Sequence, residues 1–432
     1  MAAAGRSLAG RRHDGPLRSH LRLPGARALA APAAGPALTP IRALLARRPL
    51  TVLGLAGLAS FLVSFDSSIL VLGLPAIARD FNASVPQLAD LGSGLQLGAL
   101  LGLPLAMLAD RLGRRRLLAA SVLGFSLANA ASAAAPGLAW LAAARVAAVG
   151  FETVAGAVAT ALVVEEVPGD RRGLAVAAIT IAAGAGTGLT TLLYPVLAPH
   201  WRWLYLLGCV GIPLALALAR FLPESRAWSA ARPEGLPLRL LLQPPWRRRF
   251  AVAAAAAALG AVFFEPAGLL SALYASRDLR LSPALISTSF IISGLVSVPA
   301  FPLAGRLSDR FGRRRLAAGL GAVTAVLAAA AFSGSLPAYW LGLVLWSFFA
   351  SASVPVVGAW YGELFPTRAR ATSESAATVM AALGGVAGLQ LVAAAQPHLG
   401  LGRSIAAVGA AGLVAAGLLL LLPETKGEPL PD

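Results

Sequence analysis

The sequence predicts an all-α membrane protein with twelve transmembrane helices in two pseudo-symmetric six-helix bundles. Three observations lead to this fold class. The 432-residue chain is 57% hydrophobic with a mean hydropathy of +0.74, and its charged fraction of 13% is about half the roughly 25% typical of soluble domains. Twelve segments are apolar over the about 20 residues that a spanning helix needs. An arginine-rich motif also occurs twice, at matching places in the chain.

The apolar segments define the order of the predicted spans and the domains. The expected spans cover residues 51–73, 87–109, 117–135, 138–162, 174–197, 203–222, 250–275, 284–304, 316–334, 337–361, 373–395 and 404–422. The predicted domains are a disordered basic cytoplasmic tail (1–48), an N-terminal bundle (49–222), a cytoplasmic linker (223–249), a C-terminal bundle (250–422) and a cytoplasmic tail (423–432).

The distribution of positive charge predicts the orientation. Of the 36 Lys and Arg residues, 30 lie in the two tails and in the loops that face the same side as the tails. This bias predicts an integral protein of the plasma (inner) membrane with both termini in the cytoplasm. The net charge of +17 is spread over short loops, which excludes a nucleic-acid-binding protein with one folded basic face. The arginine-rich, acid-poor tail is also typical of an organelle transit peptide or of a start codon placed too far upstream.

Several kinds of chemistry lack the residues they need. Cys209 is the only cysteine, so no intramolecular disulfide and no cysteine metal site is available. All four histidines fall in the tail or in predicted loops, and neither a nucleophile elbow nor a phosphate-binding loop is present. We therefore predict a protein that is not an enzyme and that needs no cofactor or metal.

Three motifs recur in register about 199 residues apart, which predicts two similar halves joined in tandem. The first motif combines an aspartate, a glycine and an arginine cluster. The second is Glu-x-x-Pro-x-x-x-Arg, and the third is Pro-Glu-Ser/Thr. The motifs occupy Asp110 to Arg116 and Asp309 to Arg315, Glu165 to Arg172 and Glu363 to Arg370, and Pro223 to Ser225 and Pro423 to Thr425.

These motifs resemble those of the major facilitator superfamily over essentially all of residues 50–427. Trp201-Arg202-Trp203, the segment 363–372 and the segment 423–427 further resemble its sugar porter and metabolite-proton symporter branch. Departures disfavour a hexose, because the branch's polar helix-seven residues align with Phe264, Glu265 and Leu270, and its helix-ten tryptophan aligns with Gly358. The Gly-Pro motif of many drug-proton antiporters is absent from residues 182–188.

The resemblance implies a cytoplasmic gate built from the repeated motifs. Ion pairs between carboxylates and arginines are expected to latch the cytoplasmic side while the site faces outward. The alternative is that the arginines only set topology, although the carboxylates are not needed for that. The predicted gate residues are Asp110, Arg111, Gly113, Arg114, Glu165 and Arg172 in the first half, and Asp309, Arg310, Gly312, Arg313, Glu363 and Arg370 in the second.

Asp66 and Arg145 lie at the same predicted depth inside the membrane. Each is about seven residues from the outer end of its span, so the two side chains can meet about 10 Å below the apolar surface. The resemblance supports this pairing, because proton-coupled sugar porters carry an aspartate and an arginine at the matching positions. Arginine favours the ionised carboxylate and desolvation favours the protonated one. We therefore predict Asp66 as the proton acceptor and Arg145 as its gate. The alternative is a static ion pair.

Four further residues are predicted to face the transport pathway. Glu265 lies 199 residues after Asp66 and next to Pro266, which indicates a substrate contact or a second proton site. The alternative for Glu265 is a protonated side chain bonded to a neighbour. Glu152 lies on the same helix face as Arg145, and could neutralise it or bond a hydroxyl of Thr187, Thr190 or Thr191. Gln96 and Trp346 are candidates to line the pathway, with helix packing as the alternative.

The predicted function is secondary active transport of a small polar organic solute, sugar-like or another metabolite, by alternating access with proton symport. The expected partners are the small-molecule substrate, protons and the lipid bilayer, with no nucleic acid, and the protein is expected to be monomeric. The first alternative is a proton-coupled multidrug or organic-cation efflux antiporter. The second, of another class, is a transporter-like receptor that moves nothing.

Overall fold

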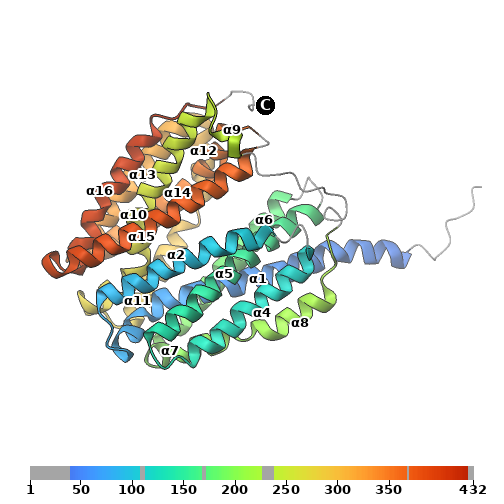
Figure 1. The fold of residues 1–432 in the computed structure, drawn as a ribbon, viewed down its shortest axis with the longest axis horizontal. Helices are drawn as coiled ribbons and strands as arrows, with labels where there is room; N and C mark the ends of the chain where they lie inside the picture. The colour runs from blue at the N-terminus through green and yellow to red at the C-terminus, as the bar shows by residue number, and fades with distance from the viewer. Residues whose placement is uncertain (1–38, 108–111, 168–171, 226–237, 367–368, 427–432) are drawn as a thin grey trace, which may run out of the picture. The chain divides into compact units, whose positions relative to one another are not determined.

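The computed structural model describes residues 39–107, 112–167, 172–225, 238–366 and 369–426, and every regular element in those ranges is a helix (Figure 1). The contacts discussed below lie within the compact unit Ala46–Asp432. The elements in chain order are α1 (Thr39–Asp80), α2 (Val85–Met107), α4 (Arg114–Ala133), α5 (Leu138–Glu166), α6 (Arg172–Leu197), η3 (Ala198–His200), α7 (Trp201–Gly208), α8 (Gly211–Phe221), α9 (Leu238–Leu241), α10 (Trp246–Arg277), α11 (Pro283–Ser297), α12 (Ala300–Phe311), α13 (Arg313–Ala331), α14 (Leu336–Leu364), α15 (Arg370–Leu399) and α16 (Leu401–Leu419).

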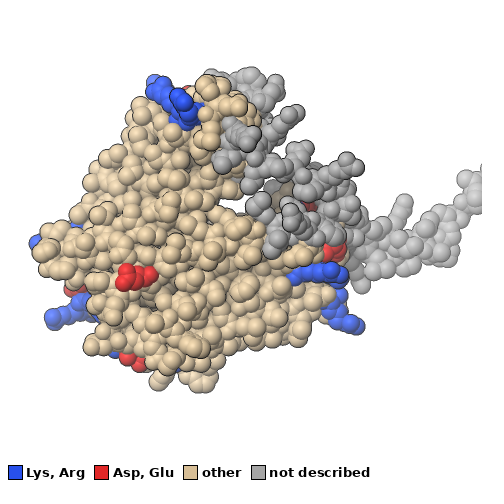
Figure 2. Space-filling view, in the orientation of Figure 1, with Lys and Arg blue, Asp and Glu red and all other residues tan. Residues whose placement is uncertain are grey.

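Eleven helical stretches of the described chain are long and apolar enough to cross a membrane. Large apolar side chains are well exposed on them, for example Leu174 at 74%, Ile181 at 73% and Val196 at 75%. The face in Figure 2 is mostly uncharged, with Lys and Arg at its edges. Large exposed apolar surfaces are typical of membrane contact. The chain is therefore an all-helical integral membrane protein.

Several boundaries differ from the sequence prediction, and two of the differences concern the domains and the number of spans. The predicted spans 174–197 and 203–222 fall in one apolar stretch of 48 residues, Leu174–Phe221, which contains α6, η3, α7 and α8. Helix α1 begins at Thr39, inside the segment predicted to be a disordered tail. Residues 39–48 are rich in Ala, Leu and Arg, which are good helix formers, so this correction has a local cause. Residues 1–38 lie outside the described part.

Close packing joins the helices within each half of the chain. In the N-terminal half α5 packs against α2 and α4, and in the C-terminal half α10 packs against α15 and α16. Gly98 of α2 lies so near the backbone of Val146 on α5 that an added Cβ would be 2.5 Å from the Val146 oxygen. Small residues at such crossings allow helices in a membrane to approach closely.

Because successive long helices run in opposite directions, the connections fall at two ends. We call the end that holds Arg114 and Arg313 the arginine end, and the end that holds residues 81–84 the opposite end. The halves touch where α15 packs against α2 and α11 against α6, and α2 and α15 run side by side in Figure 1. The hydrogen bonds between the halves join described residues in the middle of the helices or nearer the opposite end: Gln96 to Glu265, Gln390 to Asp90 and Ser93, Arg277 to the Ala83 carbonyl, and Ser287 to the Thr191 carbonyl.

Candidate functional site

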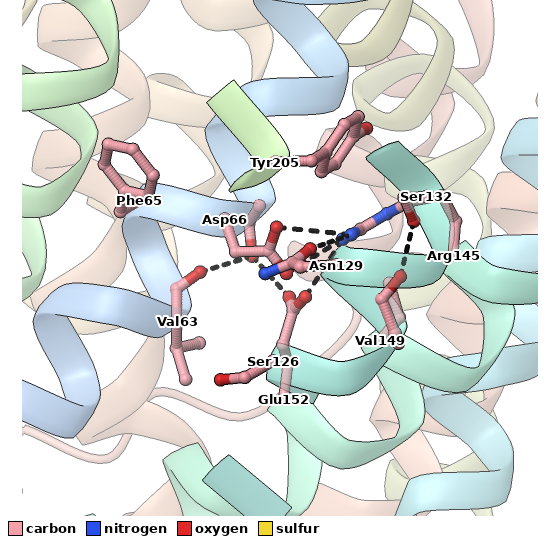
Figure 3. Close-up of polar contacts among 12 residues, drawn as sticks. Val63, Phe65, Asp66, Ser126, Asn129, Ser132, Arg145, Val149, Glu152 and Tyr205 are labelled. Atoms are coloured by element: carbon pink, nitrogen blue, oxygen red, sulfur yellow. Dashed lines mark hydrogen bonds and ion pairs between the residues drawn. The ribbon is translucent and has the colours of Figure 1, made fainter. Parts of the chain in front are cut away.

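A buried arginine holds two carboxylates in the core of the N-terminal half (Figure 3). Arg145 of α5 makes a bidentate contact with Asp66 of α1, with Nη1 to Oδ1 at 3.2 Å and Nη2 to Oδ2 at 3.0 Å. Its Nη2 also lies 3.1 Å from Glu152 Oε1. Asp66 is 0% exposed, Arg145 1% and Glu152 5%. We call Asp66, Arg145 and Glu152 the charged triad.

Helix geometry explains how these side chains meet. Arg145 and Glu152 are seven residues apart, which is two helical turns and places both on one face of α5. Asp66 faces them from the middle of α1. The ion pair between Asp66 and Arg145 occurs where the sequence placed both at one depth.

Neighbouring side chains complete the surroundings of the triad. Asn129 of α4 accepts a hydrogen bond from Arg145 Nη1 at 2.7 Å, and Ser67 donates to Glu152 Oε2 at 2.7 Å. The Arg145 guanidinium carbon lies 4.9 Å from the centre of the Tyr205 ring, a cation–π contact. The sequence analysis missed Asn129, Ser67 and Tyr205. Asn129 could have been predicted as a polar partner, because it is an amide within an apolar predicted span.

The predicted hydroxyl partner of Glu152 was wrong in its location. We expected a threonine of the fifth span, but the donor is Ser67 of α1. The threonine hydroxyls are bonded elsewhere, since Thr190 donates to the Phe65 carbonyl at 2.8 Å and Thr191 to the Thr187 carbonyl at 2.8 Å. The predicted neutralisation of Arg145 by Glu152 is present as an ion pair.

The charges of the triad do not balance. One guanidinium faces two carboxylates, so the full ionisation of all three groups leaves one net negative charge away from water. An uncompensated charge in such a place is costly. Uptake of one proton by either carboxylate makes the triad neutral. The arrangement can therefore bind and release a single proton while the arginine keeps an ionised partner.

Glu265 of α10 lies in different surroundings. Its Oε2 accepts a hydrogen bond from Gln96 Nε2 of α2 at 2.7 Å, which joins the two halves. Glu265 also lines a cavity of about 540 Å³. Trp346 does not line this cavity, and instead packs against Phe263 and Phe332 with ring centres 6.4 and 6.3 Å apart.

The arginine end carries two copies of one ion-pair arrangement. In the N-terminal half Arg114 Nη2 lies 3.1 Å from Glu165 Oε1, and Ser225 Oγ donates to Glu165 Oε2 at 2.6 Å. In the C-terminal half Arg313 Nη2 donates to Glu363 Oε1 at 3.2 Å, and Thr425 donates to Glu363 Oε2. Each of these contacts stays within its own half.

The remaining predicted gate residues have varied positions. Asp309 of α12 pairs with Arg313 of α13 at 3.0 Å, across the turn at Gly312, and its side chain is 74% exposed. The Arg310 carbonyl accepts a hydrogen bond from Lys426 Nζ at 2.8 Å. Arg370 is buried at Nε and Nη2, which have no hydrogen-bond partner among the described residues. Asp110 and Arg111 lie outside the described residues. Arg172 is the first residue of α6, and only its backbone is described.

Gly113 and Gly312 take the same turn conformation before their helices. Both have φ of 92°, a region that favours glycine, and both meet a glutamate carboxylate. An added Cβ would lie 2.5 Å from Glu224 Oε2 at Gly113 and 2.5 Å from Glu424 Oε2 at Gly312. The glycines therefore let a carboxylate approach the first turn of α4 and of α13.

Those glutamates, Glu224 and Glu424, are site residues that the sequence analysis did not assign. Glu224 Oε1 accepts from the Arg115 amide at 3.1 Å, and Glu424 accepts from the Arg313 amide at 2.8 Å and the Arg314 amide at 3.1 Å. Carboxylates at helix N-termini are stabilising. Burial raises the pKa of Glu424, but backbone N–H donors outweigh it and hold the pKa below its ordinary 4.5. The repeated Pro-Glu-Ser/Thr motif was the signal for both.

Metal binding has no support in the part of the chain that the structure describes, where no group of three or more His, Cys, Asp or Glu residues is placed to hold an ion.

Comparisons with known proteins identify a family to which this chain is similar. A family model described as the Major Facilitator Superfamily matches residues 56–271 and 261–432. The chain is 26% identical over 389 residues to the "Probable 4-methylmuconolactone transporter" of Cupriavidus pinatubonensis (strain JMP 134 / LMG 1197), covering 84% of this chain and 88% of that protein. It is 33% identical over 199 residues to the multidrug efflux pump LfrA of Mycolicibacterium smegmatis (strain ATCC 700084 / mc(2)155), covering 44% of this chain and 37% of that protein.

The fold also matches solved structures. A bacterial homolog to the human lysosomal transporter Spinster, in an inward-facing and unoccupied conformation, has a TM-score of 0.71 and 18% identity. The match covers 87% of this chain and 96% of that one. At this identity the likeness concerns the fold alone.

Proposed function

Because the chain belongs to the Major Facilitator Superfamily, we propose that it is a secondary active transporter that moves a small organic solute by alternating access, with proton symport. The predicted family is confirmed by the match over residues 56–432, and the chain is a member of a transporter family and not an enzyme. The substrate, the coupling ion and the branch of the family are parts of the proposal.

Within this proposal the chain crosses the membrane twelve times, in bundles of six at 49–222 and 250–422. The 48-residue stretch Leu174–Phe221 supports the count. As one helix it would be about 72 Å long, over twice the roughly 30 Å apolar slab. Pro195 near the end of α6, and the 3₁₀ turn η3, interrupt it where a reversal is needed. By the positive-inside rule, the arginine end and both termini face the cytoplasm of the plasma (inner) membrane. We take the protein to act as a monomer.

The observation that carries proton coupling is the charged triad. A buried pair would serve a purely structural contact poorly, because ion pairs out of water often add little stability. Here a second carboxylate leaves the site one negative charge in excess. When one carboxylate takes a proton, the other remains ionised beside Arg145, so the arginine is never left without a counter-charge. In this proposal Asp66 is the carboxylate that takes the proton, which removes the charge pair between α1 and α5 and leaves the Ser67–Glu152 hydrogen bond between them, so that protonation is coupled to helix movement.

The ion pairs at the arginine end support a different role. Arg114 with Glu165 and Arg313 with Glu363 tie helix ends together within each half. Such ties favour movement of each half as a rigid body, the motion that alternating access requires. We propose that they hold the gate geometry through the cycle. A latch between the halves at this end remains a prediction.

A second candidate function is proton-driven efflux of an organic cation. It is favoured by Glu265, a carboxylate that lines the cavity, and is consistent with the similarity of part of the chain to a multidrug efflux pump. In that case the acid in the cavity would bind protons and substrate in turn. The absence of the Gly-Pro motif from residues 182–188 counts against it.

The test is proton movement in vesicles of known orientation that contain the purified protein. External pH is recorded in weak buffer while sugars, polyols, organic acids and lipophilic cations are added in turn. Alkalinisation with one class of solute supports symport and identifies that class. Acidification that occurs only with cations supports the efflux antiporter, and no pH change with any solute contradicts proton coupling.

Asp66→Asn makes the test specific to the triad. We expect this variant to lose uphill accumulation but to retain exchange of solute between two compartments, because exchange needs no net proton transfer. The matched control is Asp80→Asn, which removes another aspartate that pairs with an arginine, Arg202, at the opposite end. Loss of exchange with unchanged substrate binding in Asp66→Asn would indicate a structural ion pair.

A further inference from the structure

The cavity of about 540 Å³ lies within the C-terminal half, among α10, α13, α14, α15 and α16. It reaches from Glu265, near the middle of α10, to residues such as Tyr361 and Leu419 near the arginine end. Its volume falls within the roughly 300–1,000 Å³ of small-molecule sites. Most of its lining is Ala, Gly, Val, Leu or Phe, so it suits a ligand with an apolar body.

The hydroxyls of the lining already donate to the backbone. Ser353 donates to the Phe349 carbonyl at 3.0 Å, Tyr361 to the Ala253 carbonyl at 2.9 Å and Thr378 to the Glu374 carbonyl at 3.0 Å. Each hydroxyl has only one proton to donate. Toward the cavity these groups therefore offer acceptors and no donors. A sugar or polyol needs donors as well as acceptors, and an anion needs donors or positive charge.

The charge of the lining has one sign. Glu265 and Glu374 line the cavity, whereas no Lys, Arg, His, Asn or Gln does so among the described residues. Gln96 bonds one Glu265 oxygen, and the described part of the chain gives the second oxygen, Oε1, no hydrogen bond. Phe264, 39% exposed, adds an aromatic ring next to this carboxylate. Aromatic rings attract organic cations.

We propose that this cavity binds an organic monocation with an apolar body, and that Glu265 is its counter-charge. The inference rests on the proposed transport function and specifies its substrate class. Gln96, which belongs to the N-terminal half, bonds the Glu265 carboxylate. The same carboxylate would therefore take part both in cation binding and in the contact between the halves. The chemistry excludes sugars and organic anions as the preferred ligands.

The test uses two probes of the same shape and opposite charge, tetraphenylphosphonium and tetraphenylborate. Equilibrium binding is measured with the purified full-length protein in detergent, without any gradient. We expect saturable binding of the phosphonium only. Glu265→Gln, which keeps the size of the side chain but removes its charge, should weaken that binding about tenfold or more. Asp80→Asn is the matched charge control and should bind like the unaltered protein.

A steric variant tests the place of binding independently of charge. Gly358 lines the cavity, and a Cβ added there meets no atom within 4 Å, so Gly358→Leu can fill the space without a clash at its Cβ. We expect this variant to weaken phosphonium binding. Gly319→Leu is the control, because Gly319 also has open space at its Cβ but does not line the cavity. Size-exclusion profiles report whether each variant is folded.

Equal binding of the two probes, or full phosphonium binding in both Glu265→Gln and Gly358→Leu, would overturn the cation site. The outcomes for transport are separate. If phosphonium binding depends on Glu265 but no proton movement accompanies any solute, the proposed coupling fails and the site stands. If a neutral solute drives proton movement and the phosphonium does not compete with it, the coupling stands and the cation site fails.

Discussion

At the arginine end, the N-terminal and C-terminal halves make the same contacts twice. The distance from arginine to glutamate is 3.1 Å between Arg114 and Glu165 and 3.2 Å between Arg313 and Glu363. The glycine before each helix has φ of 92°, and a glutamate carboxylate meets the first turn in both halves. These contacts stabilise the ends of helices, and both halves have the same helix ends at this place.

Farther along the helices, away from the arginine end, the two halves differ. Asp66 is fully buried and held by a guanidinium, whereas Glu265, 199 residues later, bonds the neutral amide of Gln96 and lines a cavity. One half thus surrounds its carboxylate with charge, and the other leaves it next to open space. A repeated scaffold can thus place two carboxylates in different surroundings. The two proposals follow this difference, with proton exchange at the first carboxylate and substrate binding at the second.

The largest effect is expected from Arg145→Met. Removing the guanidinium leaves Asp66 and Glu152 buried without a cation, which costs about 3–5 kcal/mol when one partner of a buried pair is lost. We expect a marked fall in the thermal unfolding midpoint in detergent. Adding Asp66→Asn to Arg145→Met should restore part of the loss. Glu265→Gln should cost about 1 kcal/mol or less, because an amide can still bond Gln96. Similar losses in Arg145→Met and Glu265→Gln would contradict the contrast between the halves.

An intermediate effect is expected from Gly113→Ala and Gly312→Ala. A non-glycine residue in this backbone region costs about 1–3 kcal/mol, and the new Cβ also crowds the glutamate. The two variants should lose similar stability, as measured by thermal unfolding, because the two turns match. Gly334→Ala is the control, since Gly334 has φ of 95° but no atom within 4 Å of an added Cβ. A loss in Gly334→Ala equal to the other two would mean that crowding by the carboxylates contributes nothing.

A smaller effect that depends on pH is expected from Glu424→Gln. Backbone N–H donors hold the Glu424 pKa below its ordinary 4.5, so its ionised form stabilises the folded state above that pH. The contribution is lost as the pH falls through the lowered pKa of the folded state. We therefore expect the unaltered protein to exceed Glu424→Gln in unfolding midpoint at pH 7, with the difference shrinking below about pH 4.5. A difference that does not change between pH 7 and pH 3.5 would argue against a role for its charge.

The smallest effect on stability is expected from Asp309→Asn. Its ion pair with Arg313 joins the last turn of α12 to the first residue of α13, and the carboxylate is 74% exposed, so its loss should cost only about 0.2–1 kcal/mol. We expect the variant to slow or bias the transport cycle and to leave substrate binding intact. Exchange rates in vesicles, compared with binding in detergent, measure this. Unchanged kinetics would exclude Asp309 from the gate.

Part of the site could be predicted because helices convert sequence position into depth. The spacing of Asp66 and Arg145 from their helix ends placed them at one level, where the structure pairs them. The partners supplied by other helices could not be found this way. Asn129 and Tyr205 contact Arg145 only because α4 packs beside α5 and α7 packs against α4, and hydropathy holds no information about which faces of these helices meet.

By itself the sequence determined the membrane class, the duplicated motifs and the order of the helices, with most helix ends placed to within a few residues. Hydropathy and turn residues are properties of short stretches of sequence, so they predict spans and turns without knowledge of the tertiary structure. Only the tertiary structure decided that Ser67 bonds Glu152, that Gln96 reaches Glu265 from the other half, and that Trp346 packs among aromatic rings away from the cavity. These outcomes depend on how helices rotate and cross, which is set by close packing among residues far apart in the chain.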